Sequence, residues 1–178
     1  AIKHLDCAII AVPDHLHFIV AKECLKRSIH CLMVKPFTPT IKEAQILIDI
    51  ANKKKLYCAV EFHKRWDRQN IYLKDLYETN QIGIPLYTWT EYSQRKSIPS
   101  RIFKNWVDKS NILQYLGVHY IDLIRFITGS AAKRVMAVGQ KNWLKSQGIN
   151  VHDSIQCMVE WEMPNNTRFS QTLLTNWI

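Results

Sequence analysis

The chain has 178 residues, of which 47% are hydrophobic and 22% are charged. This balance is typical of a globular protein with a sizeable core and excludes an intrinsically disordered chain. The apolar stretches are far shorter than the roughly 20 residues that a membrane helix needs, so we expect no membrane partner. The net charge of +9 allows an anionic ligand or an acidic partner but does not choose between them.

The first part of the chain alternates between short apolar runs and amphipathic segments. The apolar runs, which read as parallel strands covered on both faces, are residues 5–12, 30–34 and 56–62. The segments between them read as helices over residues 14–27 and 41–54. Thr40 and Glu43 have the spacing of a capping box at the start of the second helix. The resulting βαβαβ order predicts a parallel α/β sheet with right-handed crossovers.

After His63 the pattern changes, and we predict two domains, residues 1–64 and 65–178. The second part contains helical patterns over residues 69–78 and 113–127, the latter ended by Gly129. Strand patterns cover residues 84–92, 133–140, 154–163 and 168–176. Runs of strands with few helices predict an α+β layer with an antiparallel sheet.

Lys35 directly follows the second apolar run and precedes Pro36. This is the carboxyl end of a parallel strand, where open α/β sheets place their ligands. A lysine there can donate a hydrogen bond to a substrate oxygen, and burial can lower its pKa enough for proton transfer. The alternative is an ordinary solvated lysine at a strand end.

Tyr115, His119 and Asp122 follow one another at i, i+4 and i+7, and therefore share one face of the predicted helix. A histidine with a carboxylate one turn away is suited to act as a general acid or base, because the carboxylate fixes the tautomer of the imidazole. The alternative is that these residues only contribute to packing.

His15 and His17 stand two positions apart, which points their side chains away from each other on a helix, so we expect no metal site. The five cysteines are odd in number and show no Cys-x-x-Cys spacing. We therefore expect buried free thiols and a reducing, cytoplasmic location.

Three strings in this order carry a family resemblance: DCAIIAVPDHLH at residues 6–17, HCLMVKP at 30–36 and YLGVHYID at 115–122. Together they resemble the Gfo/Idh/MocA family of sugar oxidoreductases. The resemblance implies a Rossmann domain that binds NAD or NADP, followed by a domain with an open, mostly antiparallel sheet that also forms a subunit interface. Residues 1–64 would then be the second half of the Rossmann domain, and residues 65–178 a substrate and oligomerisation domain that is incomplete at its C-terminus.

The resemblance also implies roles for individual residues. Lys35 matches the lysine of the family's Glu-Lys-Pro motif, His119 matches the catalytic histidine, and Asp122 matches the acidic residue one turn later. The positions implied at the cofactor are Val12, Pro13, Asp14, His17, Lys35 and Pro36. The positions implied at the substrate are Lys35, Arg65, Trp106, Tyr115 and His119.

The chain also departs from the family pattern. Val34 stands where Glu is usual, Tyr115 stands where many members have Asp, and residues 109–111 replace a Gly-rich triplet. The first glycine is Gly83, so the chain has no Gly-x-Gly-x-x-Gly turn for the pyrophosphate. We therefore expect a fragment that starts within the Rossmann domain and binds NAD(P) poorly by itself.

These observations predict an NAD(P)-dependent dehydrogenase that acts on a CH–OH group of a sugar, sugar derivative or cyclitol. Cofactor-assisted hydrolysis or elimination is an alternative on the same scaffold, and a ligand-binding sensor or assembly partner without turnover is another. Nucleic-acid binding is not expected, because the basic residues are spread along the chain without a known motif.

Self-association as a dimer or tetramer is expected through the C-terminal sheet. Alternation in the strand over residues 154–163 places Ile155, Cys157, Val159 and Trp161 on one side. Such an apolar face needs a cover, which the resemblance implies is another subunit.

Overall fold

The computed structural model describes residues 4–178. The chain forms two compact units, one ending at Phe62 and the other running from His63 to Ile178. This division lies close to the boundary expected after residue 64, at the place where the alternating strand and helix pattern ends.

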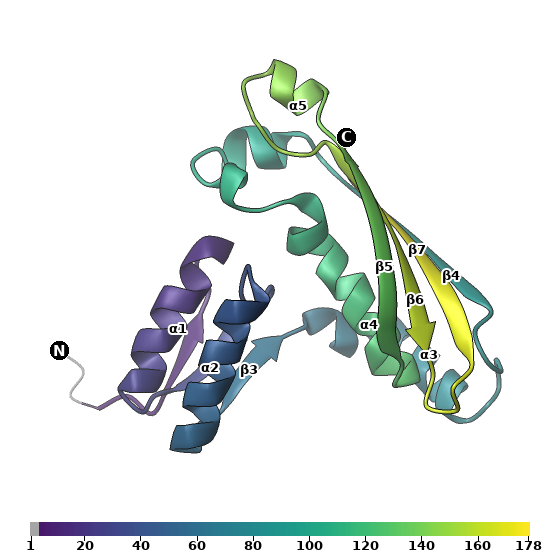
Figure 1. The fold of residues 1–178 in the computed structure, drawn as a ribbon, viewed down its shortest axis with the longest axis horizontal. Coiled ribbons are helices and arrows are strands. Elements are labelled where there is room, and N and C mark those ends of the chain that lie inside the picture. Colours follow the sequence, from purple (N-terminus) through teal and green to yellow (C-terminus); the bar gives the residue numbers. More distant parts are fainter. Residues whose placement is uncertain (1–3) are drawn as a thin grey trace. The chain divides into compact units, whose positions relative to one another are not determined.

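The first unit (purple to blue in Figure 1) has the predicted βαβαβ order. Its elements are β1 (Cys7–Ile10), α1 (His17–Lys26), β2 (His30–Val34), α2 (Ile41–Lys54) and β3 (Cys58–Glu61). The three strands are parallel and lie in the order β1-β2-β3. A short 3-10 turn, Asp14–Leu16, connects β1 to α1.

The core of this unit lies on one face of its sheet only. Both helices contribute to it, and its buried members are Ile10, Ala21, Leu25, Cys31, Met33, Leu47 and Ala51. The opposite face carries Ile9 and Leu32, which are exposed. The expectation that the strands are covered on both faces is therefore wrong for residues 4–62, because α1 and α2 share one core.

The predicted capping box at the start of α2 is formed in part, since the Glu43 carboxylate accepts from the Thr40 hydroxyl where a full capping box would use the Thr40 backbone N–H. The Glu43 backbone N–H donates to the Thr40 hydroxyl oxygen at 3.3 Å, and that hydroxyl donates to the Glu43 carboxylate at 3.0 Å. The cap satisfies a backbone donor that the first helical turn leaves without a partner.

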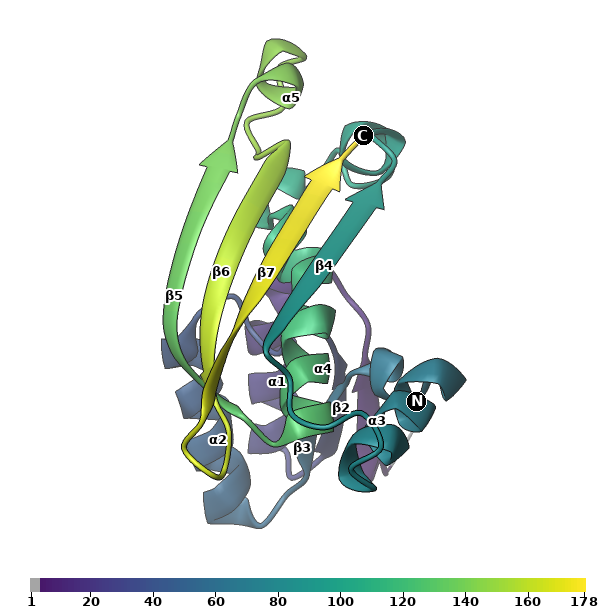
Figure 2. The same cartoon turned by 90° about the vertical axis from the view of Figure 1, so that its right-hand side faces the viewer.

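The second unit is a four-stranded sheet with one long helix against it (Figure 2). Its main elements are α3 (Arg68–Glu78), β4 (Tyr87–Gln94), α4 (Val118–Thr128), β5 (Ala131–Gln140), α5 (Trp143–Ser146), β6 (Ser154–Glu162) and β7 (Arg168–Trp177). The strand order is β4-β7-β6-β5, with β4 parallel to β7 and the other pairs antiparallel. The sheet is therefore mostly antiparallel, as predicted.

The helix predicted over residues 113–127 is divided into two parts. Leu113–Gly117 forms a π-helical turn, and α4 follows it. Gly129 ends α4 with a φ of 69°, a conformation that favours glycine. A Cβ on Gly117 would lie 3.3 Å from side-chain atoms of Leu173 and Thr175, so this glycine permits the helix start to approach β7 closely.

The sheet face expected to need a second subunit is covered by the chain itself. Ile155, Cys157, Val159 and Trp161 are all buried. The core around Trp161 also includes side chains of α4, among them Tyr120 and Ile124. The expectation for this face was wrong, because alternation along a strand separates two faces but does not show which of them a helix of the same chain covers.

All five cysteines are free thiols, and Cys31 and Cys157 are buried. Cys7 is exposed, contrary to expectation. Among residues 4–178, no helix combines the length and the apolar character needed to cross a bilayer.

Replacing Thr40 by Ala should lower the free energy of unfolding by about 0.5–2 kcal/mol, because the Glu43 N–H loses its acceptor. Urea unfolding monitored by circular dichroism measures this. Thr40→Ser keeps the hydroxyl and is the matched control, which should stay close to the original stability. Equal losses in the two variants would contradict the role of the cap.

Candidate active site

Lys35 lies at the carboxyl edge of the three-stranded sheet, directly after β2. Its side chain is partly buried, and burial lowers the pKa of its ammonium group. The carboxylates of Asp14 and Glu61 act in the opposite direction and raise this pKa. The side chain is therefore not that of an ordinary solvated lysine but a partly desolvated amine between two acidic groups.

His17 is fully buried at the start of α1. Its Nδ1 lies 2.6 Å from the carbonyl oxygen of Pro36, and its Nε2 lies 2.9 Å from that of Val12. Three of the positions implied at the cofactor are thus joined to one another, and both ring nitrogens of His17 are used within the protein.

Asp14 is also buried, at 4% exposure, and begins the turn that follows Pro13. The carboxyl edge of this sheet therefore combines a buried acid, a buried imidazole and a partly desolvated amine. Such a set fits the polar nicotinamide end of a dinucleotide. A glycine-rich cradle for the pyrophosphate is absent from this unit, since the first glycine of the chain is Gly83.

In the second unit, His119 lies in the first turn of α4 and is 2% exposed. The ring of His63 stands edge-on to that of His119, with 4.4 Å between the ring centroids. We did not select His63 from the sequence. It follows β3 as Lys35 follows β2, so the criterion that selected Lys35 would have found it.

Asp122 is held by Arg65 through two hydrogen bonds. The guanidinium Nε and Nη2 donate to the two carboxylate oxygens at 2.7 and 2.5 Å. The Asp122 side chain is 8% exposed and that of Arg65 is 34% exposed. These hydrogen bonds raise the pKa of Arg65. The carboxylate is therefore anchored by a cation, and its role in orienting His119 stays a prediction.

Tyr115 and Trp106 belong to one aromatic cluster. The ring centroid of Phe103 lies 4.3 Å from that of Trp106 and 4.8 Å from that of Tyr115. The ring of Trp177 stacks on that of Tyr115, with 6.2 Å between the centroids. The cavity beside these rings has a volume of about 10 Å³. It is too small for a sugar in this conformation, so substrate binding by Tyr115 and Trp106 stays a prediction.

The structure thus joins His63, Arg65, His119 and Asp122 in pairs around the start of α4, and joins Trp106 and Tyr115 elsewhere in the same unit. Within the described part of the chain, no group of three or more His, Cys, Asp or Glu side chains is placed to hold a metal ion.

Replacing Arg65 by Met should lower the free energy of unfolding by about 3 kcal/mol, because it leaves the largely buried Asp122 carboxylate without its cation. Arg134→Met is the matched control: Arg134 makes a similar two-point contact with Glu160 but is 79% exposed, and its loss should lower the free energy of unfolding much less, because solvent screens an exposed ion pair. Urea unfolding measures both variants. Equal losses of unfolding free energy in the two variants would show that burial of Asp122 does not determine the strength of its ion pair with Arg65.

Comparison with known proteins gives two matches of family models. Residues 1–62 match the NAD-binding Rossmann fold of the GFO/IDH/MocA oxidoreductase family, and residues 71–172 match the GFO/IDH/MocA C-terminal domain. The two matches follow one another along the chain and leave only a short connection around residues 63–70 between them.

Relatives and solved structures agree with these matches. UDP-N-acetylglucosamine 3-dehydrogenase from Acidithiobacillus ferrooxidans is 30% identical over 138 residues, which is 78% of this chain and 41% of that protein. The NADP-dependent scyllo-inositol 2-dehydrogenase from Bacillus subtilis is 26% identical over 119 residues, 66% of this chain and 33% of that protein. The crystal structure of myo-inositol 2-dehydrogenase from Lactobacillus plantarum has the same fold, with a TM-score of 0.83, 17% identity, and coverage of 99% of this chain and 52% of that one.

The chain spans about a third to two fifths of the length of these two curated relatives. The C-terminal domain model alone matches more than half of the chain, and the Rossmann model matches the part before it. The chain therefore belongs to the GFO/IDH/MocA oxidoreductase family.

Proposed function

We propose that this chain is part of an oxidoreductase that transfers a hydride between NAD(P) and a hydroxyl or keto carbon of a sugar, a sugar derivative or a cyclitol. The observation that carries the proposal is the presence of both family domains, in order, on one chain. The names of the relatives, which are dehydrogenases of a nucleotide sugar and of an inositol, support the substrate class. Because the chain is shorter than these proteins, the activity is proposed for a longer protein that contains it.

NAD(P), when bound, accepts the hydride in oxidation and returns it in reduction. Pro13, Asp14 and Lys35 are the residues that we assign to its nicotinamide end, since they lie where β1 and β2 end. Val12 and Pro36, which adjoin these residues, are assigned to the same end. The ring of His17 is occupied by two carbonyl groups, so its contribution is to hold this edge together.

His119 is assigned to removal of the hydroxyl proton. A carbinol carbon releases hydride only as its hydroxyl loses a proton, so a base must lie within hydrogen-bond reach of that oxygen. An imidazole that is 2% exposed is shielded from bulk water and is held in place by α4 and by the ring of His63. Asp122, fixed by Arg65, supplies a negative charge one turn further along the same helix.

Lys35 is assigned to polarisation of the oxygen that becomes the carbonyl. A partly desolvated ammonium stabilises developing negative charge more strongly than one in bulk water, because the surrounding dielectric is lower. Asp14 and Glu61 favour the charged form of this group, since both oppose the lowering of its pKa by burial.

In the complete enzyme, His119→Ala should lower turnover by about 10²–10⁴-fold while leaving cofactor affinity nearly unchanged, because it removes a general base. Lys35→Ala should lower turnover in the same range and also raise KM for the substrate. Steady-state kinetics and cofactor titration measure these effects. His152→Ala, a histidine between α5 and β6, is the control and should keep normal turnover. Near-normal turnover of His119→Ala across the pH range would refute the assignment.

The alternative is a ligand-binding sensor or assembly partner without turnover. Val34 and Tyr115, which depart from the family pattern, are the residues that favour it. Reduction of NAD and of NADP across a panel of polyols, inositols and nucleotide sugars distinguishes the two functions. Ligand binding without reduction of either cofactor would favour the sensor.

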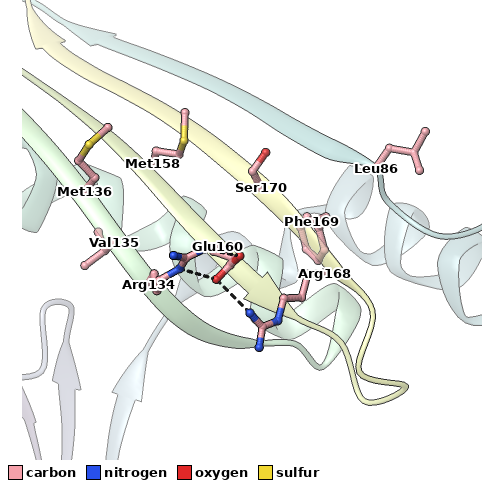
Figure 3. A pocket seen from close by; sticks show the side chains of 9 residues that line it. All are labelled: Leu86, Arg134, Val135, Met136, Met158, Glu160, Arg168, Phe169 and Ser170. Carbon is pink, nitrogen blue, oxygen red and sulfur yellow. Dashed lines mark hydrogen bonds and ion pairs between the residues drawn. The ribbon is translucent and has the colours of Figure 1, made fainter.

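We further propose that the open face of the four-stranded sheet binds a second copy of the protein. This face carries exposed apolar side chains next to ion pairs, and Figure 3 shows Met136 and Met158 close to the Arg134, Glu160 and Arg168 group. They line a hollow of about 600 Å³. Apolar groups beside charges of both signs suit a self-complementary interface around a two-fold axis.

Met158→Lys should shift the protein towards the monomer, because it places an additional positive charge in the apolar part of this face. Ile41→Lys, at an 89% exposed position of α2, is the matched control and should leave the oligomeric state unchanged. Light scattering after size exclusion measures both. A Met158→Lys protein that keeps its oligomeric mass would show that this face is not the interface.

A further inference from the structure

His17 stands between two backbone carbonyl groups. The ring is fully buried, with Nδ1 2.6 Å from the Pro36 oxygen and Nε2 2.9 Å from the Val12 oxygen. The Nε2 distance is that of an ordinary N–H···O hydrogen bond, and the Nδ1 distance is somewhat shorter.

These two contacts determine where the protons are. A carbonyl oxygen accepts hydrogen bonds and cannot donate one. A neutral imidazole has one N–H and one bare nitrogen, so in either tautomer a nitrogen lone pair would face a carbonyl lone pair at 2.6 or 2.9 Å. Only the imidazolium form, which has an N–H on both nitrogens, donates to both carbonyls.

The two carbonyls belong to the segments that carry the proposed chemistry. Val12 follows the end of β1, and Pro36 is the residue directly after Lys35. On its other side, Lys35 is held by β2, where Val34 pairs with Glu61 of β3. The hydrogen bond from His17 to Pro36 is therefore a tether immediately beside Lys35, at the point where the chain leaves the sheet.

We infer that His17 is a doubly protonated clamp that joins the ends of β1 and β2 and thereby positions Lys35. This inference rests on the proposed function of Lys35, but the protonation state of His17 does not. The role differs from the direct cofactor contact that the family resemblance implied for this residue.

Several charges act on such a clamp. The ionisable groups of the adjoining segments are Asp14, His15, Lys35 and Glu61, and Asp14 is itself buried. The carboxylate of Asp14 and the two carbonyl dipoles favour a positive ring, whereas burial of the ring, the charge of Lys35 and the amino end of α1 oppose it. The geometric basis for a positive ring is that both of its nitrogens face a carbonyl oxygen.

Nitrogen-15 NMR of the histidine rings in this chain tests the protonation state directly. At neutral pH, His17 should show two protonated nitrogens. Its signals are assigned by their loss in His17→Asn. A spectrum with one bare nitrogen on His17 would overturn the clamp, whatever the enzyme activity is.

Three variants test the positioning of Lys35. His17→Asn places an amide donor at the position of Nδ1, facing Pro36. His17→Gln places an amide donor at the position of Nε2, facing Val12. His17→Leu fills the same space with an apolar side chain that has no donor. In the complete enzyme, turnover should fall by roughly 10- to 10²-fold in His17→Leu and in His17→Gln, and it should be largely kept in His17→Asn.

The pH profile of Lys35 acylation, followed by mass spectrometry in the chain itself, is the second measurement. Burial lowers the pKa of Lys35, so release of the Pro36 tether should move its profile towards that of the exposed Lys42 in the Leu and Gln variants, but not in the Asn variant. Unchanged Lys35 profiles in stably folded Leu and Gln variants would reduce His17 to a packing role. A Lys35→Ala enzyme with normal turnover would instead refute the proposed function and leave the NMR result standing.

Discussion

A single buried amide, that of Gln171, joins α4 to the four-stranded sheet. Its oxygen accepts from the indole Nε1 of Trp161 at 3.1 Å, and its nitrogen donates to the backbone carbonyl of Tyr120 at 3.2 Å. Because an unsatisfied buried amide is costly, α4 is held where the Tyr120 carbonyl can accept from the Gln171 nitrogen. This contact fixes the position of the first turn of α4, which carries His119, relative to the sheet. The position of the proposed base therefore follows from a polar link within an otherwise apolar interface.

The same packing determines which face of the sheet remains available to a partner. Trp161 and the other inward side chains of β6 are used by α4, whereas Met158 and Glu160, on the alternate positions, are on the opposite face. The ion pairs of Glu160 with Arg134 and Arg168 lie in solvent and contribute little to the stability of the unit. Their role in the proposed interface is different: a face that carries charges of both signs beside apolar groups is complementary to a copy of itself.

The first unit concentrates charged and polar groups at one edge of its sheet. Its core is apolar, but Asp14 and His17 are buried next to the strand ends, and Lys35 is partly buried there. Burying such groups is unfavourable unless they are paired, so they restrict the turns that follow β1 and β2 to a narrow set of conformations. An edge that holds its polar groups in fixed positions before ligand arrives loses less free energy on binding.

Much of this arrangement could be predicted from the order of residues alone, because it depends on local chemistry. The βαβαβ order follows from apolar runs, the start of α2 from the hydroxyl of Thr40, and the end of α4 from Gly129, each of which acts within a few residues of itself. The proposed site residues Lys35 and His119 could be selected because strand ends and helix faces are recognisable from residue spacing. Contacts between distant segments could not be predicted: Arg65 reaches Asp122 across 57 positions, and the side of β6 that α4 covers is decided by packing. Such contacts depend on how surfaces formed by different parts of the chain fit together, and spacing along the sequence carries no measure of that fit.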